Sequence, residues 1–538
     1  MTKIPVPTTS RRSLFALAGV MGTAAAFTGT LSACGTTPSQ RASAGSSSGA
    51  GANVNGTIRA AISYELGTNG FDPMTTSSAL TVAANWHTME GLTEILPSGK
   101  RDVFAALGKD LPKKVDDVTY EVTLRDGAVF HNNAPVTTDD VVYSFARVLD
   151  PANKSLYAQF ITFLDKVEKK DDKTVTIRLK YAFSLVAERI AVVKIVPKAA
   201  ATADPKAFDA NPVGTGPYKM TDNSATSKQV VFEKFAAYTG PRPAKAAAMT
   251  WKVMPDDATR LNALTSKAVQ AVDLIPDLSI ESVKASAAVE SIQGFALLFA
   301  MFNCGSAPFN NVKNRQGFLW ALDMANIVKT AYLGNATPSS SFVQETHPSY
   351  QKAKNVYSLD VAKAKALFAE TGLKSIRLLC TDHAWVQKAT PIIKSNLEAA
   401  GLTVDFTQKK SSDVYTTIDA SPNAFDAVIA PGDPSVFGSD ADLLLRWWYA
   451  NDTWTNKRMH WKGQDSYTQM QALLDKATKA TGAEQKAVWG QVFDLVSEVV
   501  PMYPLFHRKS TTGYDNKTLI DFKPIAVTGL SFLDTATS

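Results

Sequence analysis

The chain has 538 residues, of which 45% are apolar and 20% charged, and its formal net charge is +6. This length is long for one hydrophobic core, so two or three lobes are expected. There is no long basic run and no nucleic-acid-binding signature, so the sequence offers no basis for a nucleic-acid partner.

The first residues have the pattern of an export signal. Arg11 and Arg12 precede an uncharged, largely apolar stretch at 14–27, and small residues follow. This order is typical of an exported precursor, and we place the signal peptide at residues 1–33. The twin-arginine route and the general secretory route both stay open. No later segment approaches about 18 uncharged apolar residues, so no membrane span is expected.

A single cysteine ends this region. The residues Leu31-Ser32-Ala33-Cys34 resemble the lipobox of bacterial lipoproteins, which predicts lipid attachment at Cys34. Two acyl chains are sufficient for stable membrane anchoring. Residues 34–55 then carry the lipid and form a flexible tether rich in Ser, Gly and Ala. The alternative is a free or disulfide-bonded cysteine in a disordered N-terminus, which leaves its position after the apolar stretch unexplained.

From residue 56 onward, strand and helix patterns alternate. Alternating apolar residues predict half-buried strands, in segments 57–65, 119–131 and 173–180. Thr137 precedes Asp140 by three residues in a capping arrangement, which predicts a helix that Pro151 ends. The apolar residues of this helix fall on one face: Val141, Val142, Phe145 and Val148.

The second half has the helix, glycine, strand order of an α/β layer. One helix is expected from a cap at Ser358 or Asp360 to Gly372. A second is expected from Pro391 to Gly401, before a strand at 402–406. These patterns predict an α/β protein with two different lobes, roughly 56–300 and 301–505.

Motifs for catalysis are not found. A nucleophile-elbow pattern matches only at 45–49, inside the tether, where no strand or helix would hold the serine. The six histidines are scattered without metal-ligand spacing, so no metal and no cofactor is expected. His131 is interpreted as a structural histidine, and the segment at 214–217 as a turn. Cys304 and Cys380 are expected to be two separate thiols, although a disulfide is allowed outside the cytoplasm.

Five segments resemble one family, in the family's order. They are "MEGLTEILPSGK", "YEVTLRDGAVFHNNAPVTTDDVVYSFARVLDP", "NPVGTGPYKM", "FNCGSAPFNNVKNRQGFLWALDMANIVKTAYLG" and "LDVAKAKALFAETG". These segments are similar to those of the extracytoplasmic solute-binding proteins of peptide- and nickel-type ABC importers, family 5. The resemblance covers roughly residues 57–535, and the second segment is the most distinctive.

The resemblance implies a periplasmic-binding-protein-like fold, with two lobes, a cleft between them and a hinge of crossing strands. Lobe I would comprise residues 56–90, 206–300 and 506–538, with an extra subdomain at 91–205, and lobe II residues 301–505. It further implies a binding protein in place of an enzyme, which acts at the outer face of the cell membrane. The expected partners are a small-molecule or peptide ligand and an ABC permease with its cytoplasmic ATPase, and the expected state is a monomer.

The resemblance also suggests where the ligand binds. In peptide-binding relatives an aspartate of the second lobe pairs with the ligand's α-amine, and Asp433, after the strand expected at 427–430, is the best match. Asp440 or Asp442 would serve if the loop is offset. The alternative is that Asp433 belongs to a simple turn and bonds to its own backbone. Of the adjacent Trp447 and Trp448, at most one is expected to face the cleft.

One departure from the family concerns the ligand's carboxylate. Dipeptide-specific relatives bind it with an arginine after a strand of the second lobe, but Arg377 comes too early here. The loop instead holds four other residues: Thr381, Asp382, His383 and Trp385. Free dipeptides are therefore doubtful ligands, and a longer peptide, or a cationic or sugar-like solute stacked on Trp385, is favoured. His383 in a metal-chelate site is a weaker alternative, and Tyr64, after the first strand, completes the candidate ligand contacts.

The leading hypothesis is therefore a lipid-anchored receptor that presents a small solute, in the first place an oligopeptide, to an importer. An anchored hydrolase is the rival class, and it is disfavoured because no nucleophile, base and orienting group can be assembled. A third alternative is a protein that keeps this fold but serves as a sensor or chaperone.

Overall fold

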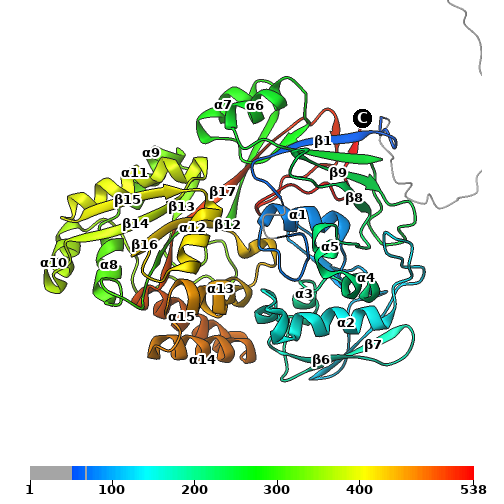
Figure 1. Ribbon diagram of the computed structural model, residues 1–538, viewed down its shortest axis with the longest axis horizontal. Coiled ribbons are helices and arrows are strands. Elements are labelled where there is room, and N and C mark those ends of the chain that lie inside the picture. Colours follow the sequence, from blue (N-terminus) through cyan, green and yellow to red (C-terminus); the bar gives the residue numbers. More distant parts are fainter. Residues whose placement is uncertain (1–50, 67–69) are drawn as a thin grey trace, which may run out of the picture. The chain divides into compact units, whose positions relative to one another are not determined.

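The computed structural model describes residues 51–66 and 70–538 (Figure 1). The expected signal peptide, the expected lipid attachment at Cys34 and most of the expected tether lie outside these residues. The structural description therefore begins at residue 51, near the end of the expected tether.

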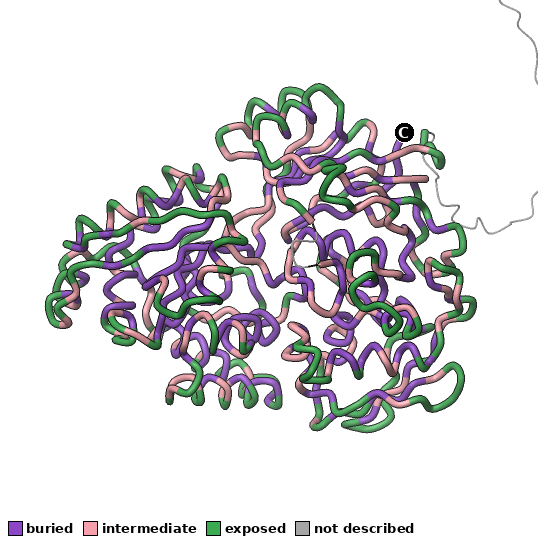
Figure 2. Tube along the Cα trace, in the orientation of Figure 1, coloured by how far each residue is buried: buried purple, intermediate pink, exposed green. Residues whose placement is uncertain are grey.

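A large mixed sheet contains most of the strands. Its order is β15-β14-β16-β12-β17-β11-β1-β10-β9-β8, and β13 pairs beside it with β17. The bounds, in the same order, are Thr403–Lys409, Ser375–Thr381, Ala427–Gly432, Ala288–Phe302, Met502–Tyr514, Ala271–Val272, Thr57–Ile62, Ala248–Val253, Gln229–Lys234 and Tyr218–Asp222, with β13 at Ala336–Pro338. Figure 2 shows many of these strands buried beneath exposed helical faces.

Two long antiparallel strands, β12 and β17, connect the two ends of this sheet. They pair from Ala288 opposite Tyr514 to Met301 opposite Met502, with a register shift between Gln293 and Leu297. Gly294 lies in this shift, and a Cβ there would come 1.8 Å from the carbonyl oxygen of Ala526. This close approach leaves no room for a side chain, so position 294 requires glycine. Figure 1 shows the two strands running side by side between the two groups of elements.

A smaller sheet has the order β4-β5-β7-β6, with bounds Lys113–Asp116, Thr119–Thr123, Thr174–Leu179 and Leu164–Lys169. Helix α2 (Thr138–Leu149) begins at the predicted capping box, in which Thr137 and Asp140 each bond to the other's backbone. Its predicted face is buried at Val141, Phe145 and Val148. The prediction for this helix is confirmed.

Two helices of the second half differ in how well they were predicted. Helix α10 (Val361–Thr371) is capped by Asp360 and ends at Gly372 in the left-handed conformation, as expected. Helix α11 (Ala384–Ala399) begins before Pro391, which lies inside it, so the expected start at Pro391 is wrong. Buried Val386 and Ala389 hold the earlier turns against the protein. This packing outweighs the hydrogen bond that proline removes. Trp385 is therefore on the first turn of a helix and not in a loop.

The other elements complete the two groups around the sheets. The remaining helices are α1 (Ala79–Thr88), α3 (Val186–Ile190), α4 (Lys198–Ala203), α5 (Pro205–Ala210), α6 (Asp257–Thr265), α7 (Ile280–Lys284), α8 (Val312–Trp320), α9 (Met324–Tyr332), α12 (Ser411–Ala420), α13 (Ala441–Tyr449), α14 (Asp465–Lys479) and α15 (Gly482–Val499). The remaining strands are β2 (Thr93–Ile95), β3 (Val103–Ala105), β18 (Leu519–Ile520) and β19 (Ala536–Thr537).

The C-terminal segment packs against the first elements of the described chain. Phe532 N–H donates to Nε2 of buried His87 at 2.9 Å, while Nδ1 of His87 lies 2.9 Å from the carbonyl oxygen of Ala83. Burial lowers the pKa of His87 to about 4, so the ring is neutral at pH 7 and Nε2 can accept this bond. The end of the chain is therefore fixed to α1.

The predictions for one histidine and two cysteines agree with the structure. His131 bonds to the carbonyl oxygen of Gly216 at 3.0 Å, as a structural histidine does. Cys304 and Cys380 are buried free thiols, as expected. Within residues 51–66 and 70–538, none of the helices has the length and apolar character needed to cross a bilayer.

Candidate ligand-binding site

The predicted ligand residues fall into two clusters. The hinge cluster consists of Tyr64 after β1, His383 and Trp385 at the start of α11, and Arg508 on β17. The α13 cluster consists of Arg101, Arg189, Asp433, Asp440 and Asp442, around the start of α13. Asp382 stands beside the first cluster, and its carbonyl oxygen accepts a hydrogen bond from Gln387.

Aromatic contacts hold the hinge cluster together. Trp385 Nε1 donates to the Tyr64 hydroxyl at 3.2 Å. The His383 ring packs edge-on against Tyr64 with centroids 4.9 Å apart. Burial lowers the pKa of His383 to about 4 and raises that of Tyr64 to about 12, so both are uncharged at pH 7. Tyr64, which was predicted from the sequence, thus contacts two other predicted residues, His383 and Trp385.

Sequence reasoning missed Arg508 in this cluster. Its guanidinium carbon lies 4.6 Å from the centre of the Trp385 ring. Its Nε donates to the Lys509 carbonyl at 3.3 Å. The available signal was the pair Arg508-Lys509 directly after a run of buried residues on β17, where charge is unexpected.

The carboxylate of Asp433 is already engaged within the chain. One oxygen accepts bonds from the backbone N–H and the hydroxyl of Ser435. The other accepts from the N–H and the hydroxyl of Thr528, both at 2.8 Å. The turn interpretation thus describes one half of its contacts. The other half connects the end of β16 to the C-terminal segment.

Asp440 and Asp442 are both ion-paired with Arg189, which is 1% exposed. Arg189 Nε donates to Asp440 at 3.0 Å, Nη2 donates to Asp442 at 2.8 Å, and Nη1 donates to the carbonyl of Phe160 at 2.7 Å. Burial alone would raise the pKa of Asp440, but the charge and hydrogen bonds of Arg189 lower it. The net result is a pKa below the usual value of an aspartate. Asp440 also caps α13, and Asp442 also pairs with Arg446. These carboxylates bind other parts of the chain.

Arg101 is the one member of the α13 cluster for which no side-chain hydrogen bond or ion pair is found among the described residues. Its Nε is buried without a hydrogen-bond partner among the described residues. Burial lowers its pKa to about 10, while the charges of Asp433 and Asp440 raise it. It forms no ion pair with either acid in the described part of the chain.

The two tryptophans of α13 are both buried. Trp448 is fully buried, with its ring 5.7 Å from that of Phe299. Trp447 is 7% exposed and packs on Phe160 and Phe437, with ring centroids 6.1 Å and 5.1 Å away. Trp448 is the residue in the core, and Trp447 lies between segments with little exposed surface.

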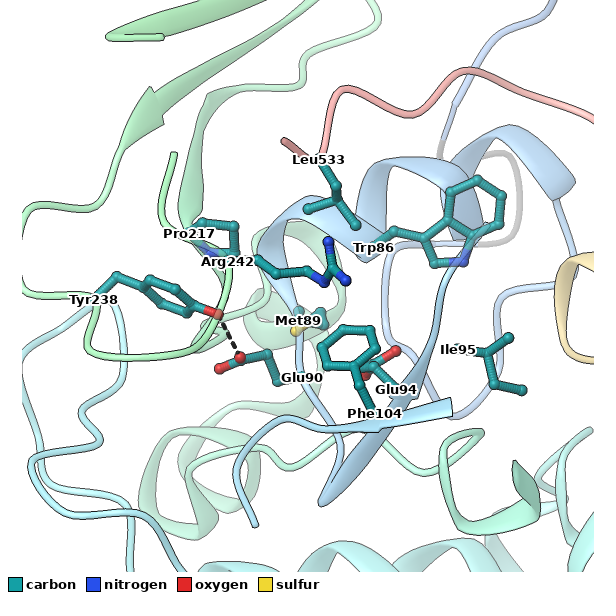
Figure 3. Close-up of a pocket in the computed structure, with 10 residues that line it drawn as sticks. All are labelled: Trp86, Met89, Glu90, Glu94, Ile95, Phe104, Pro217, Tyr238, Arg242 and Leu533. Carbon is teal, nitrogen blue, oxygen red and sulfur yellow. Dashed lines mark hydrogen bonds between the residues drawn. The ribbon is translucent and has the colours of Figure 1, made fainter. Parts of the chain in front are cut away.

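Two small pockets lie outside both clusters. The first has a cavity volume of only about 20 Å³, and Figure 3 shows Arg242 and Phe104 among its lining residues, with Tyr238 bonded to Glu90. The second has a cavity volume of about 30 Å³, and its lining includes Trp86 and Phe437. None of the predicted ligand residues lines either pocket. Nor do three or more His, Cys, Asp or Glu side chains of residues 51–66 and 70–538 gather as metal ligands.

The long strands β12 and β17 join two groups of elements. Aromatic contacts at Tyr64 also connect these groups. This arrangement is that of a two-lobed binding protein. A model of the bacterial extracellular solute-binding proteins, family 5, matches residues 103–468, and the chain belongs to this family. It is therefore a solute-binding component of an ABC importer and acts outside the cytoplasm. The predicted family, the predicted fold class and the preference for a binding protein over an enzyme are confirmed.

Individual relatives differ in their ligands. The glutathione-binding protein GsiB of Escherichia coli (strain K12) is 26% identical over 78% of this chain and 83% of its own length. The solved dipeptide-binding protein of Pseudoalteromonas sp. SM9913, in complex with Met-Leu, has a TM-score of 0.79 at 19% identity, covering 90% of this chain and all of that one. AgaA of A. tumefaciens R10, in complex with agropinic acid, has a TM-score of 0.79 at 23% identity, covering 90% and 99%.

Replacing Arg189 tests whether its pairs hold the two groups together. We expect Arg189→Gln to lower the free energy of unfolding by about 3 kcal/mol or more, because Asp440 loses its ion pair and buried Asp442 keeps only its pair with Arg446. Urea unfolding measures this change. Arg178→Gln, which breaks an exposed pair with Glu168, is the control and should cost less than about 1 kcal/mol. Equal losses in the two variants would contradict the assignment.

Proposed function

We propose that this chain captures a small extracellular solute, in the first place an oligopeptide, and releases it to a membrane permease driven by a cytoplasmic ATPase. The contact between Tyr64 and Trp385 carries this proposal, because it joins a residue after β1 to a residue of α11. In the proposed division, lobe I comprises 56–90, 206–300 and 506–538, the extra subdomain 91–205, and lobe II 301–505. The contact then crosses from one lobe to the other.

Ligand binding would act on such contacts. A ligand shifts the equilibrium between open and closed forms only if it binds one form better. A backbone amide or hydroxyl of the ligand would exchange bonds with the Tyr64 hydroxyl and the Trp385 N–H. Bending at the two crossing strands would accompany this exchange.

The arrangement of the hinge cluster disfavours one alternative ligand class. The guanidinium of Arg508 already covers a face of Trp385, so a cationic solute would meet a positive charge at that ring. A sugar-like solute or a metal chelate stays a second candidate, because related proteins are described with ligands as different as glutathione and agropinic acid. A hydrolase stays disfavoured, because the sequence motifs do not supply a nucleophile, a base and an orienting group.

The ligand class is tested by native mass spectrometry of the protein purified gently from its own host. Closed binding proteins retain ligand, so we expect a ladder of co-purified masses spaced by amino-acid residues. Denatured protein is the control for covalent adducts. A single mass without peptide composition would contradict the peptide assignment and leave the importer role intact.

Anchoring is proposed to depend on lipid at Cys34. We expect Cys34→Ala to move the protein from the membrane fraction to the soluble fraction, because two acyl chains supply the attachment. Fractionation and immunoblotting measure this, with an unchanged thermal unfolding midpoint as the control for folding. A variant that stays in the membrane fraction would refute the anchor.

Asp433 is proposed to contact the ligand's amine when the cleft rearranges. We expect Asp433→Ala to weaken binding of the co-purified ligand by about tenfold or more, since a charge-assisted bond is lost. The free energy of unfolding should fall by less than the binding free energy does. Calorimetry and urea unfolding compare the two. Asp419→Ala, which removes the surface partner of Arg458, is the matched control, and unchanged affinity in Asp433→Ala would place the amine elsewhere.

A further inference from the structure

The segment that follows β17 contributes buried side chains to two different hydrophobic clusters. We call residues 522–532 the C-terminal strap. Phe522 and Phe532 belong to the cluster around β1, β9 and β10. Ile525 and Val527, which lie between them in the chain, belong to a larger cluster that includes the buried residues of β12, β14 and β16. The strap is therefore anchored by apolar packing in both clusters.

The strap also lies against the point where the pairing of β12 with β17 is interrupted. The register of these strands shifts between Gln293 and Leu297. The hydroxyl of Ser510, on β17, donates to the carbonyl oxygen of Ala526 at 3.2 Å. On β12, a Cβ at Gly294 would lie 1.8 Å from the same oxygen. The strap thus contacts both crossing strands where their hydrogen-bond ladder is already broken.

Thr528 connects the strap to the segment after β16. Its backbone N–H and its hydroxyl both donate to the same carboxylate oxygen of Asp433, each at 2.8 Å. A few residues later, the backbone N–H of Phe532 donates to His87 of α1 at 2.9 Å. In the proposed division Asp433 belongs to lobe II and His87 belongs to lobe I. The strap therefore forms hydrogen bonds with both lobes.

Gly529 lies between these two contacts and sets the path of the strap. Its φ is +124°, which residues with a side chain rarely adopt, and a Cβ there would lie 2.7 Å from the Cβ of Ala83 in α1. The chain from Thr528 to Phe532 spans at most about 14 Å even when fully extended. A large separation of the lobes at this place therefore requires the bonds between Thr528 and Asp433 to break.

We propose that the C-terminal strap is a latch that keeps the two lobes together when no solute is bound, through the two bonds from Thr528 to Asp433. Hydrogen bonds to a carboxylate are stronger than bonds between neutral groups. They favour the closed form because they exist only while lobe II stays beside the strap. The inference uses the proposed division into lobes, and it holds for a solute of any class.

Two hydroxyl groups bound to Asp433 give a matched pair of variants. Thr528→Val removes the hydroxyl that the strap donates, and Ser435→Ala removes the hydroxyl donated from the segment directly after Asp433. Each variant takes one hydroxyl from the same carboxylate, but only the first removes a bond between the lobes. We expect Thr528→Val to raise the ratio of open to closed molecules about tenfold or more, and Ser435→Ala to leave this ratio unchanged.

Double electron–electron resonance measures the ratio as a distance distribution between two spin labels. Thr226→Cys, in the exposed turn between β8 and β9, labels lobe I, and Lys365→Cys, on the exposed face of α10, labels lobe II. Cys304 and Cys380 are buried and Cys34 is proposed to carry lipid, so the two introduced thiols react. The full chain is measured in detergent after unfolding and refolding have removed any bound solute. Urea unfolding shows whether the two variants lose similar stability.

A larger open population in Thr528→Val than in Ser435→Ala supports the latch. A wild-type distribution in Thr528→Val overturns it. Equal opening in the two variants also overturns it, because the effect would then come from the carboxylate's own turn. Should Thr528→Val fail to refold, Thr528→Ala removes the same hydroxyl with a smaller side chain and is judged by the same outcomes. Thr528→Ser keeps both donors and should restore the wild-type distribution.

Discussion

The antiparallel pairing of β12 with β17 is the constraint on which the rest of the structure depends. β16 pairs with β12 on one side, and β11 and β13 pair with β17 on the other, so the two ends of the large sheet meet only through these two strands. Buried backbone groups must keep their hydrogen bonds, so any relative movement has to bend the pair without breaking it. The register shift at Gly294 is where the ladder is already interrupted and bending breaks the fewest bonds. Arg508 belongs to β17, its guanidinium lies over the Trp385 ring, and Trp385 donates to Tyr64.

Charge is arranged differently in the two clusters. In the α13 cluster, Arg189 is enclosed by Asp440, Asp442 and a carbonyl oxygen, so nearly every donor is used. Such a network is costly to desolvate and costly to break, and it therefore favours one arrangement of the segments that it joins. In the hinge cluster His383 and Tyr64 are uncharged at pH 7, and Arg508 forms no ion pair with the residues that the structure describes. The two clusters therefore differ in what a ligand could change, because a ligand favours one form only through contacts that it makes better in that form.

The sequence predicted those features that depend on neighbouring residues. The capping box at Thr137, the helix between Asp360 and Gly372 and the strand before Asp433 all carry local signals, and each forms as expected. The start of α11 was wrong because a proline normally marks a first turn, whereas packing of Val386 extends this helix toward β14. The engagement of Asp433 with Thr528 spans 95 residues of the chain, and no local pattern reports such a contact.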